Sequence, residues 1–180
     1  NYWPGSCGVE MWNVWPEEEI RRDLTLVRDL GLNSVRFFLR WEDFEPWAGR
    51  HAARSFRRLD QFLGWCREAD LTVQPSLFVG WMSGGIFWPT WKAGRNAFSD
   101  SFMRRRAVAL AAAAARVCAR HGDIVLAMDQ GNELCCLPDC STAAPAEVAT
   151  WCAEVNAAIA REFPTALRIS GHEQKQVGAD

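Results

Sequence analysis

Asn132 and Glu133 are the residues whose types and position point most directly to chemistry. They end an apolar stretch that begins at Ile124 and has the length of a buried parallel strand. A carboxylate at the carboxyl end of such a strand lies where barrel enzymes place their catalytic groups. The same pair also fits an ordinary solvated turn, because Asn and Glu are common loop residues. The surrounding elements have to distinguish these two interpretations.

The composition indicates one domain with a sizeable core. The chain has 180 residues, of which 49% are hydrophobic, and a formal net charge of −2. This balance gives no indication of disorder, of a nucleic-acid partner or of a basic membrane-surface protein. The Ala-rich stretch 107–115 is flanked by arginines and is too short to span a membrane. No cofactor is expected.

The seven cysteines leave the cellular compartment open. Cys66, Cys118 and Cys152 lie in helical patterns and are expected to be buried thiols. Three further cysteines share the loop 135–140, where a short disulfide to Cys140 could form in a secreted protein. A metal site is disfavoured there because no His lies nearby. The sequence contains no signal peptide, and a secreted location remains compatible with it.

Helical and extended patterns alternate along the whole chain. Helices are expected over 17–30, over 56–66, from Asp100 to about 121, and from Pro145 to about 159. Strands are expected over 33–39, 71–79, 124–132 and 167–170, and residues 1–4 resemble the end of an earlier strand. Pro75 lies inside the second of these strands, so a bulge or local break is expected at that point.

This alternation predicts an α/β fold with a parallel sheet and crossover helices. A doubly wound sheet and a (β/α)8 TIM barrel both agree with it. No Gly-x-Gly-x-x-Gly or Walker loop follows any of the predicted strands. We therefore favour the barrel, with only the first four to five β/α units present.

Tryptophan is several times more frequent than usual, with ten residues in the chain. Eight of them follow predicted strands, where the loops of a barrel rise at one face. They are Trp3, Trp12, Trp15, Trp41, Trp47, Trp81, Trp88 and Trp91. Indole faces stack on the C–H-rich faces of sugar rings, which favours a carbohydrate cleft. Some of the eight are instead expected to cap the barrel and pack its loops.

Three stretches resemble the clan-A glycoside hydrolases, the retaining (β/α)8 enzymes that include family-five cellulases and β-mannanases. They are the segment Asn1-Tyr2-Trp3-Pro4, the region from Ile20 through Arg36 to Pro46, and the strand that ends in Asn132-Glu133. The resemblance extends over nearly the whole chain. It implies that residues 1–180 are a partial TIM-barrel catalytic domain.

The resemblance also implies roles for particular residues. Glu133 matches the acid/base, Asn132 the residue that holds a sugar 2-hydroxyl, and Arg36 the arginine that supports the nucleophile. A retaining mechanism needs an acid that protonates the leaving oxygen and a second carboxylate about 5–5.5 Å away. A partly apolar site would keep that acid protonated near neutral pH. Arg36 would also fit a surface ion pair.

The family's nucleophile is a glutamate after the seventh strand, and the predicted strands stop at the fifth. We expect the nucleophile to lie outside this chain. Glu173 could line the cleft but matches no nucleophile, and Asp129 receives no catalytic role. The expected substrate contacts are Asn132, Arg36, Trp3, Trp41, Trp81 and His172. His172 would equally fit a plain loop position.

The favoured function is hydrolysis of O-glycosidic bonds in a β-linked mannan- or cellulose-like substrate. The alternative is a non-catalytic partial barrel that binds carbohydrate, and a third is an unrelated doubly wound protein. Carbohydrate is the expected partner, without nucleic acid or membrane. An incomplete barrel would expose sheet edges, so self-association through them is also expected.

Overall fold

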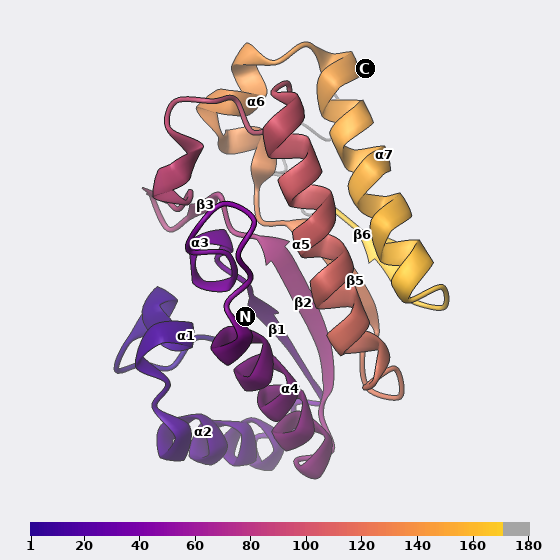
Figure 1. Ribbon diagram of the computed structural model, residues 1–180. Coiled ribbons are helices and arrows are strands. Elements are labelled where there is room, and N and C mark those ends of the chain that lie inside the picture. Colours follow the sequence, from indigo (N-terminus) through magenta and orange to yellow (C-terminus); the bar gives the residue numbers. More distant parts are fainter. Residues whose placement is uncertain (171–180) are drawn as a thin grey trace.

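The computed structural model describes residues 1–170, and a four-stranded parallel sheet is its centre (Figure 1). The strands are β1 (Ser34–Phe38), β2 (Thr72–Phe78), β5 (Ala127–Gly131) and β6 (Leu167–Ile169), in that spatial order. The long helices between them are α2 (Glu17–Asp29), α4 (Ala53–Glu68), α5 (Ser101–Ala119) and α7 (Pro145–Glu162). These elements confirm the alternation expected from the sequence.

Short elements occupy the N-terminal segment before α2 and the connections that follow the strands. They are the helices α1 (Met11–Val14), α3 (Trp41–Phe44) and α6 (Pro138–Thr142), and the two-stranded hairpin of β3 (Trp81–Met82) and β4 (Gly85–Ile86). Three single turns of 3₁₀ helix complete the set, at Gly8–Glu10, Thr90–Lys92 and Leu134–Cys136. The sequence patterns treated these connections as plain loops.

Of the long helices named above, α2, α5 and α7 start where the sequence predicts, whereas α4 already starts at Ala53. Asp100 caps α5, since its carboxylate accepts hydrogen bonds from the backbone N–H groups of Phe102 and Met103. Pro145 occupies the first turn of α7, where its missing N–H costs nothing. The glutamates of the first turn of α2 complement the positive end of the helix dipole.

The long helices α4, α5 and α7 lie side by side along one face of the sheet (Figure 1). Phe37 of β1 packs against Phe62 of α4, and Gln130 of β5 donates a hydrogen bond to the Cys152 carbonyl of α7. Polar side chains of neighbouring strands project from the opposite face. A doubly wound sheet has helices on both faces, whereas a barrel has them only outside. The arrangement confirms the barrel interpretation.

Pro75 disturbs the ladder on one side only. The pairing of β1 with β2 runs through Pro75 without a shift, from Ser34–Thr72 to Phe38–Ser76. On the other side, Val73 pairs with Val125, but Ser76 pairs with Asp129, so the β5 segment contains one extra residue. Proline cannot donate a ladder hydrogen bond, and the expected break therefore falls on this side.

Residues 1–4 do not form the strand end that the sequence suggested. The segment lies beside β1 and is held there by a backbone hydrogen bond of 2.8 Å from Tyr2 N to the Arg36 carbonyl. The Tyr2 ring packs on Phe62, and its hydroxyl donates to Asp23 of α2. The segment is therefore anchored mainly by its side chains.

An exposed ion pair joins α4 to the turn after α5. Hydrogen bonds from the Arg67 guanidinium lower the pKa of Asp123 to about 2. A carboxylate with a depressed pKa in the folded state stabilises the fold above its ordinary pKa, and this contribution disappears as the pH falls through the folded-state value. Urea unfolding of Asp123→Asn and the unmodified protein should therefore differ above pH 4 and converge toward pH 2. A difference that does not change with pH would contradict this.

Candidate active site

Four polar side chains from three neighbouring strands meet at the carboxyl ends of β1, β2 and β5. Arg36 of β1 donates from one Nη to Asn132 Oδ1 at 3.0 Å. Its other Nη contacts Ser76 Oγ at 3.0 Å and Asp129 Oδ2 at 2.6 Å. The Ser76 hydroxyl in turn donates to Asp129 Oδ2 at 2.6 Å. Arg36 and Asn132, which lie far apart in the sequence, are thus in direct contact.

The amide of Asn132 is held from both sides. Its Oδ1 faces Arg36, and its Nδ2 donates to the Trp81 carbonyl of the β3–β4 hairpin at 2.8 Å. Its backbone N–H extends the ladder to the Phe78 carbonyl at 3.0 Å. The side chain is therefore fixed in one orientation by β1 and by the loop after β2.

Glu133 has a left-handed backbone, with φ 47° and ψ 44°. This conformation costs a non-glycine residue about 1–2 kcal/mol. The turn is maintained by a hydrogen bond from Cys136 N to the Glu133 carbonyl and by the pairing of Asn132 with β2. Strained backbone of this kind is concentrated at functional sites. The side chain is half-buried, and among residues 1–170 it accepts no hydrogen bond.

Gly131 permits this turn because no larger residue fits there. A Cβ atom at this position would lie 2.6 Å from the Phe78 carbonyl oxygen and 2.9 Å from two carbons of Leu134. The backbone clash cannot be relieved by a rotamer change. We expect Gly131→Ala to destabilise the fold by about 1–3 kcal/mol, typical of overpacking, and to displace Asn132.

Gly64 provides the matched control, because it lies in α4 and a Cβ atom there meets nothing within 4 Å. Gly64→Ala should stabilise the fold by about 0.5–1 kcal/mol through helix propensity. Chemical denaturation of both variants measures the two changes in the free energy of unfolding. Equal stability of the two variants would refute the claim that residue 131 has no room for a side chain.

The eight strand-end tryptophans divide into a buried group and a partly exposed group, and Trp41, an expected substrate contact, belongs to the buried group. Trp12 and Trp41 are fully buried. The Trp12 indole donates to the Phe38 carbonyl, and Trp41 donates to the buried carboxylate of Glu45. Trp15 stacks between Trp12 and Trp65. Trp41 therefore supports the loops from behind and is not a substrate contact.

The remaining strand-end indoles keep part of their surface. Trp3 stacks on Phe38, whose ring also lies under the Arg36 guanidinium at 4.6 Å. Trp81 and Trp88 are half-buried, and Trp47 is exposed. Within residues 1–170, the indole N–H groups of Trp3 and Trp88 are buried without a hydrogen-bond partner. Trp3 and Trp81 thus remain candidates to line a sugar site.

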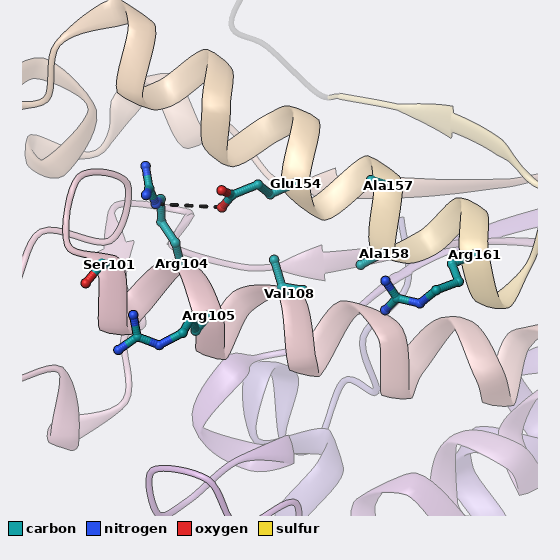
Figure 2. A pocket seen from close by; sticks show the side chains of 8 residues that line it. All are labelled: Ser101, Arg104, Arg105, Val108, Glu154, Ala157, Ala158 and Arg161. Carbon is teal, nitrogen blue, oxygen red and sulfur yellow. Dashed lines mark ion pairs between the residues drawn. The ribbon is translucent and has the colours of Figure 1, made fainter.

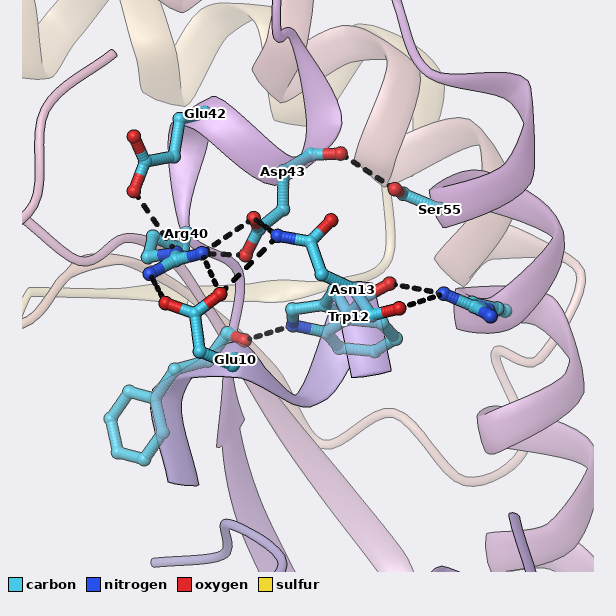
Figure 3. A network of polar contacts seen from close by, with 9 residues as sticks. Glu10, Trp12, Asn13, Arg40, Glu42, Asp43 and Ser55 are labelled. Atoms are coloured by element: carbon cyan, nitrogen blue, oxygen red, sulfur yellow. Dashed lines mark hydrogen bonds and ion pairs between the residues drawn. The ribbon is translucent and has the colours of Figure 1, made fainter. Parts of the chain in front are cut away.

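Sequence reasoning missed a second polar network beside this site (Figure 3). The guanidinium of Arg40 is almost completely buried and is surrounded by Glu10, Glu42 and Asp43. Hydrogen bonds from Arg40 lower the pKa of Glu10, while burial raises that of Asp43 against the opposing effect of Arg40. Strand alternation places residue 40 on the same face as residue 36, and this was the sequence signal that could have indicated a second polar group there.

A groove of about 400 Å³ lies elsewhere, between α5 and α7 on the helical side of the sheet (Figure 2). Three arginines line it, and one of them, Arg104, faces Glu154 across the groove at 3.6 Å. Its place between two outer helices separates it from the carboxyl ends of the strands. It is not the candidate active site.

Two predicted residues, His172 and Glu173, lie outside the described residues 1–170. Within residues 1–170, Cys66 and Cys118 are buried free thiols, and Cys140 is a free, half-buried thiol. The described residues contain no group of His, Cys, Asp and Glu arranged to hold a metal ion. Among the described helices, none has the length and apolar character of a membrane span.

Solved structures match this fold over almost all of the chain. The chain is 51% identical to an exo-β-1,4-mannosidase, Op5Man5, from Opitutaceae bacterium strain TAV5, with a TM-score of 0.96 over 100% of this chain and 32% of that one. A GH5_18 protein from Streptomyces cattleya, solved with GlcNAc, is 25% identical, with a TM-score of 0.89, and covers 96% of this chain and 43% of its own. An endo-glycoceramidase II from Rhodococcus sp. shares the fold at 21% identity and a TM-score of 0.71, over 83% of this chain and 43% of that one.

The chain thus spans less than half the length of these proteins. No family model matches it, and no curated protein does. The one-sided helical layer and the Arg-Asn-Glu arrangement at the strand ends define part of a clan-A (β/α)8 barrel. Within that class, the chain is similar to the exo-β-1,4-mannosidase Op5Man5 and to GH5_18 proteins, and it corresponds to one part of their barrel.

Proposed function

We propose that the protein carrying this chain is a retaining glycoside hydrolase that cleaves β-linked mannosides, and that residues 1–180 are part of its catalytic domain. The observation that carries the proposal is the meeting of Arg36, Asn132 and Glu133 at the carboxyl ends of parallel strands. The similarity to Op5Man5, named as an exo-β-1,4-mannosidase, favours mannosides over glucosides.

In this proposal Glu133 is the acid/base. As an acid it protonates the leaving glycosidic oxygen, and as a base it later takes a proton from the attacking water. Its backbone leaves the strand conformation in a left-handed turn, and its side chain is half-buried.

Asn132 is proposed to hydrogen-bond the sugar 2-hydroxyl, and Arg36 to hold Asn132 and the region around the nucleophile. The nucleophile is proposed to be a second carboxylate about 5–5.5 Å from Glu133, supplied from outside this chain. Trp3 and Trp81 would contact the apolar face of the sugar, and His172 stays a proposed contact from the sequence. This mechanism calls for no cofactor.

Hydrolysis of a substrate panel by the protein carrying this chain tests the proposal. We expect manno-oligosaccharides with β-1,4 linkages to be cleaved from one end, with mannose as the first product, and faster than the matching cello-oligosaccharides. Faster cleavage of the glucans would contradict the mannoside assignment. Binding of the oligosaccharides without hydrolysis, measured by tryptophan fluorescence, would support the non-catalytic binding module instead.

The isolated chain is also expected to self-associate. Strand β6 lies at the edge of the sheet, and Leu167 at 67%, Leu126 at 52% and Ile169 at 38% are unusually exposed for large apolar residues. Unpaired strand edges with apolar side chains promote association. Light scattering of the 180-residue chain should therefore show species larger than a monomer. A stable monomer at high concentration would refute this.

A further inference from the structure

The side chain of Arg36 has to cross an entire strand to reach Asn132. Strand β2 lies between β1 and β5, and neighbouring strands are about 4.8 Å apart, so the backbones of β1 and β5 are about 10 Å apart. The Arg36 side chain passes over β2 and meets side chains that extend from the far strand. Ser76 occupies the position of β2 beneath this path and is fully buried. Its hydroxyl accepts from Arg36 at 3.0 Å. A small residue there leaves room for the guanidinium, and its hydroxyl gives the guanidinium a fixed contact.

Asp129 completes the attachment on the far strand. Ser76 and Asp129 are in register on β2 and β5, and the hydroxyl donates to Asp129 Oδ2 at 2.6 Å. The same oxygen accepts from Arg36 at 2.6 Å, and Asp129 is only 1% exposed. The other carboxylate oxygen accepts from the Gly131 backbone at 3.2 Å. Charge-assisted bonds of this length in a buried setting hold the guanidinium in one plane.

We infer that Ser76 and Asp129 are positioning residues that set the orientation of the Asn132 amide through Arg36. One Nη of Arg36 is held by Ser76 and Asp129, and this directs the other Nη at Asn132 Oδ1. The amide then donates one proton to the Trp81 carbonyl, and within residues 1–170 its second N–H is left for a ligand. The inference rests on the proposed function, in which Asn132 binds the sugar 2-hydroxyl.

Ser76→Ala and Asp129→Asn test this in the protein carrying the chain, with Ser55→Ala as the matched control. Ser55 is also a buried serine, but its hydroxyl donates to the Asp43 carbonyl, away from Arg36. The first measurement compares kcat/KM for a β-mannoside with that for its 2-deoxy analogue. We expect this preference to fall about tenfold in Ser76→Ala and Asp129→Asn and to stay unchanged in Ser55→Ala.

A second measurement does not depend on activity. The side-chain amide signal of Asn132 in a ¹⁵N NMR spectrum, assigned with Asn132→Asp, should shift or broaden in Ser76→Ala and Asp129→Asn but not in Ser55→Ala. An unchanged signal, or equal preference for the 2-hydroxyl in all variants, would overturn the inference. If the unmodified protein cleaves no mannoside, the proposed function fails, while the NMR signal still decides whether Ser76 and Asp129 position Asn132.

Discussion

Glu133→Gln is expected to lower kcat/KM for an unactivated β-mannoside by about 10²- to 10⁴-fold, the usual contribution of a positioned general acid. Gln has nearly the same size and keeps the same backbone restriction, but it cannot supply a proton. The loss should be much smaller for a dinitrophenyl β-mannoside, because that leaving group departs without protonation. Steady-state kinetics on the two substrates therefore separate a lost acid from a disturbed fold.

Glu68→Gln is the matched control for this variant. Glu68 is a surface carboxylate, 66% exposed, that contacts Arg21 at 3.6 Å and lies far from the strand ends. Its replacement should leave kcat/KM unchanged, because exposed ion pairs contribute little. If Glu133→Gln affected both leaving groups equally, or neither, its role as the acid would be excluded.

Arg40→Met is expected to destabilise the fold by about 3–5 kcal/mol at neutral pH. The guanidinium is 6% exposed and lies against Glu10, Glu42 and Asp43, so its removal leaves several carboxylates without their counter-charge. In the variant, binding of protons removes the negative charges of these carboxylates and with them the repulsion that destabilises the fold. The deficit, measured by urea unfolding, should therefore narrow as the pH is lowered from about 7 toward 4.

Arg67→Met is the control, because it removes an arginine that is 42% exposed and pairs with Asp123 at the surface instead of in a buried network. Its replacement should cost about 0–1 kcal/mol. If Arg40→Met does not fold, Arg40→Lys keeps the charge and loses the planar pair of contacts to Glu10, so a partial loss is expected. Equal effects at positions 40 and 67 would show that the buried network contributes no more to stability than an exposed pair.

The order of the elements could be predicted because each has a strong local signal. The Pro-Glu start of α2, the Asp100 cap of α5 and the β-branched and aromatic pattern of β1 depend on nearby residues. The position of Asn132-Glu133 at a strand end follows from the same local patterns. Alternation along β1 also places Arg36 on one face of the sheet, where contact with Asn132 becomes possible.

The features that the sequence did not predict depend on distant partners. Trp41 and Trp12 were expected among the indoles after the strands, but both are fully buried. The Trp12 indole donates to the Phe38 carbonyl of β1, and the Trp41 indole donates to the Glu45 carboxylate after α3. In the network around Arg40, strand alternation indicates only the face on which Arg40 lies. Its partner Glu10 comes from a separate segment 30 residues away, so the pairing itself has no local signal. The left-handed turn at Glu133 follows Gly131, whose close approach to the Phe78 carbonyl is a contact between strands that a local pattern does not report.

The stereochemistry of hydrolysis tests the central claim most directly. Proton NMR can follow the first mannose released from an aryl β-mannoside by the protein carrying this chain. A two-carboxylate retaining site in which Glu133 is the acid/base predicts β-mannose as the first product, and much slower release by Glu133→Gln. Initial release of α-mannose, or undiminished activity in that variant, would contradict this account.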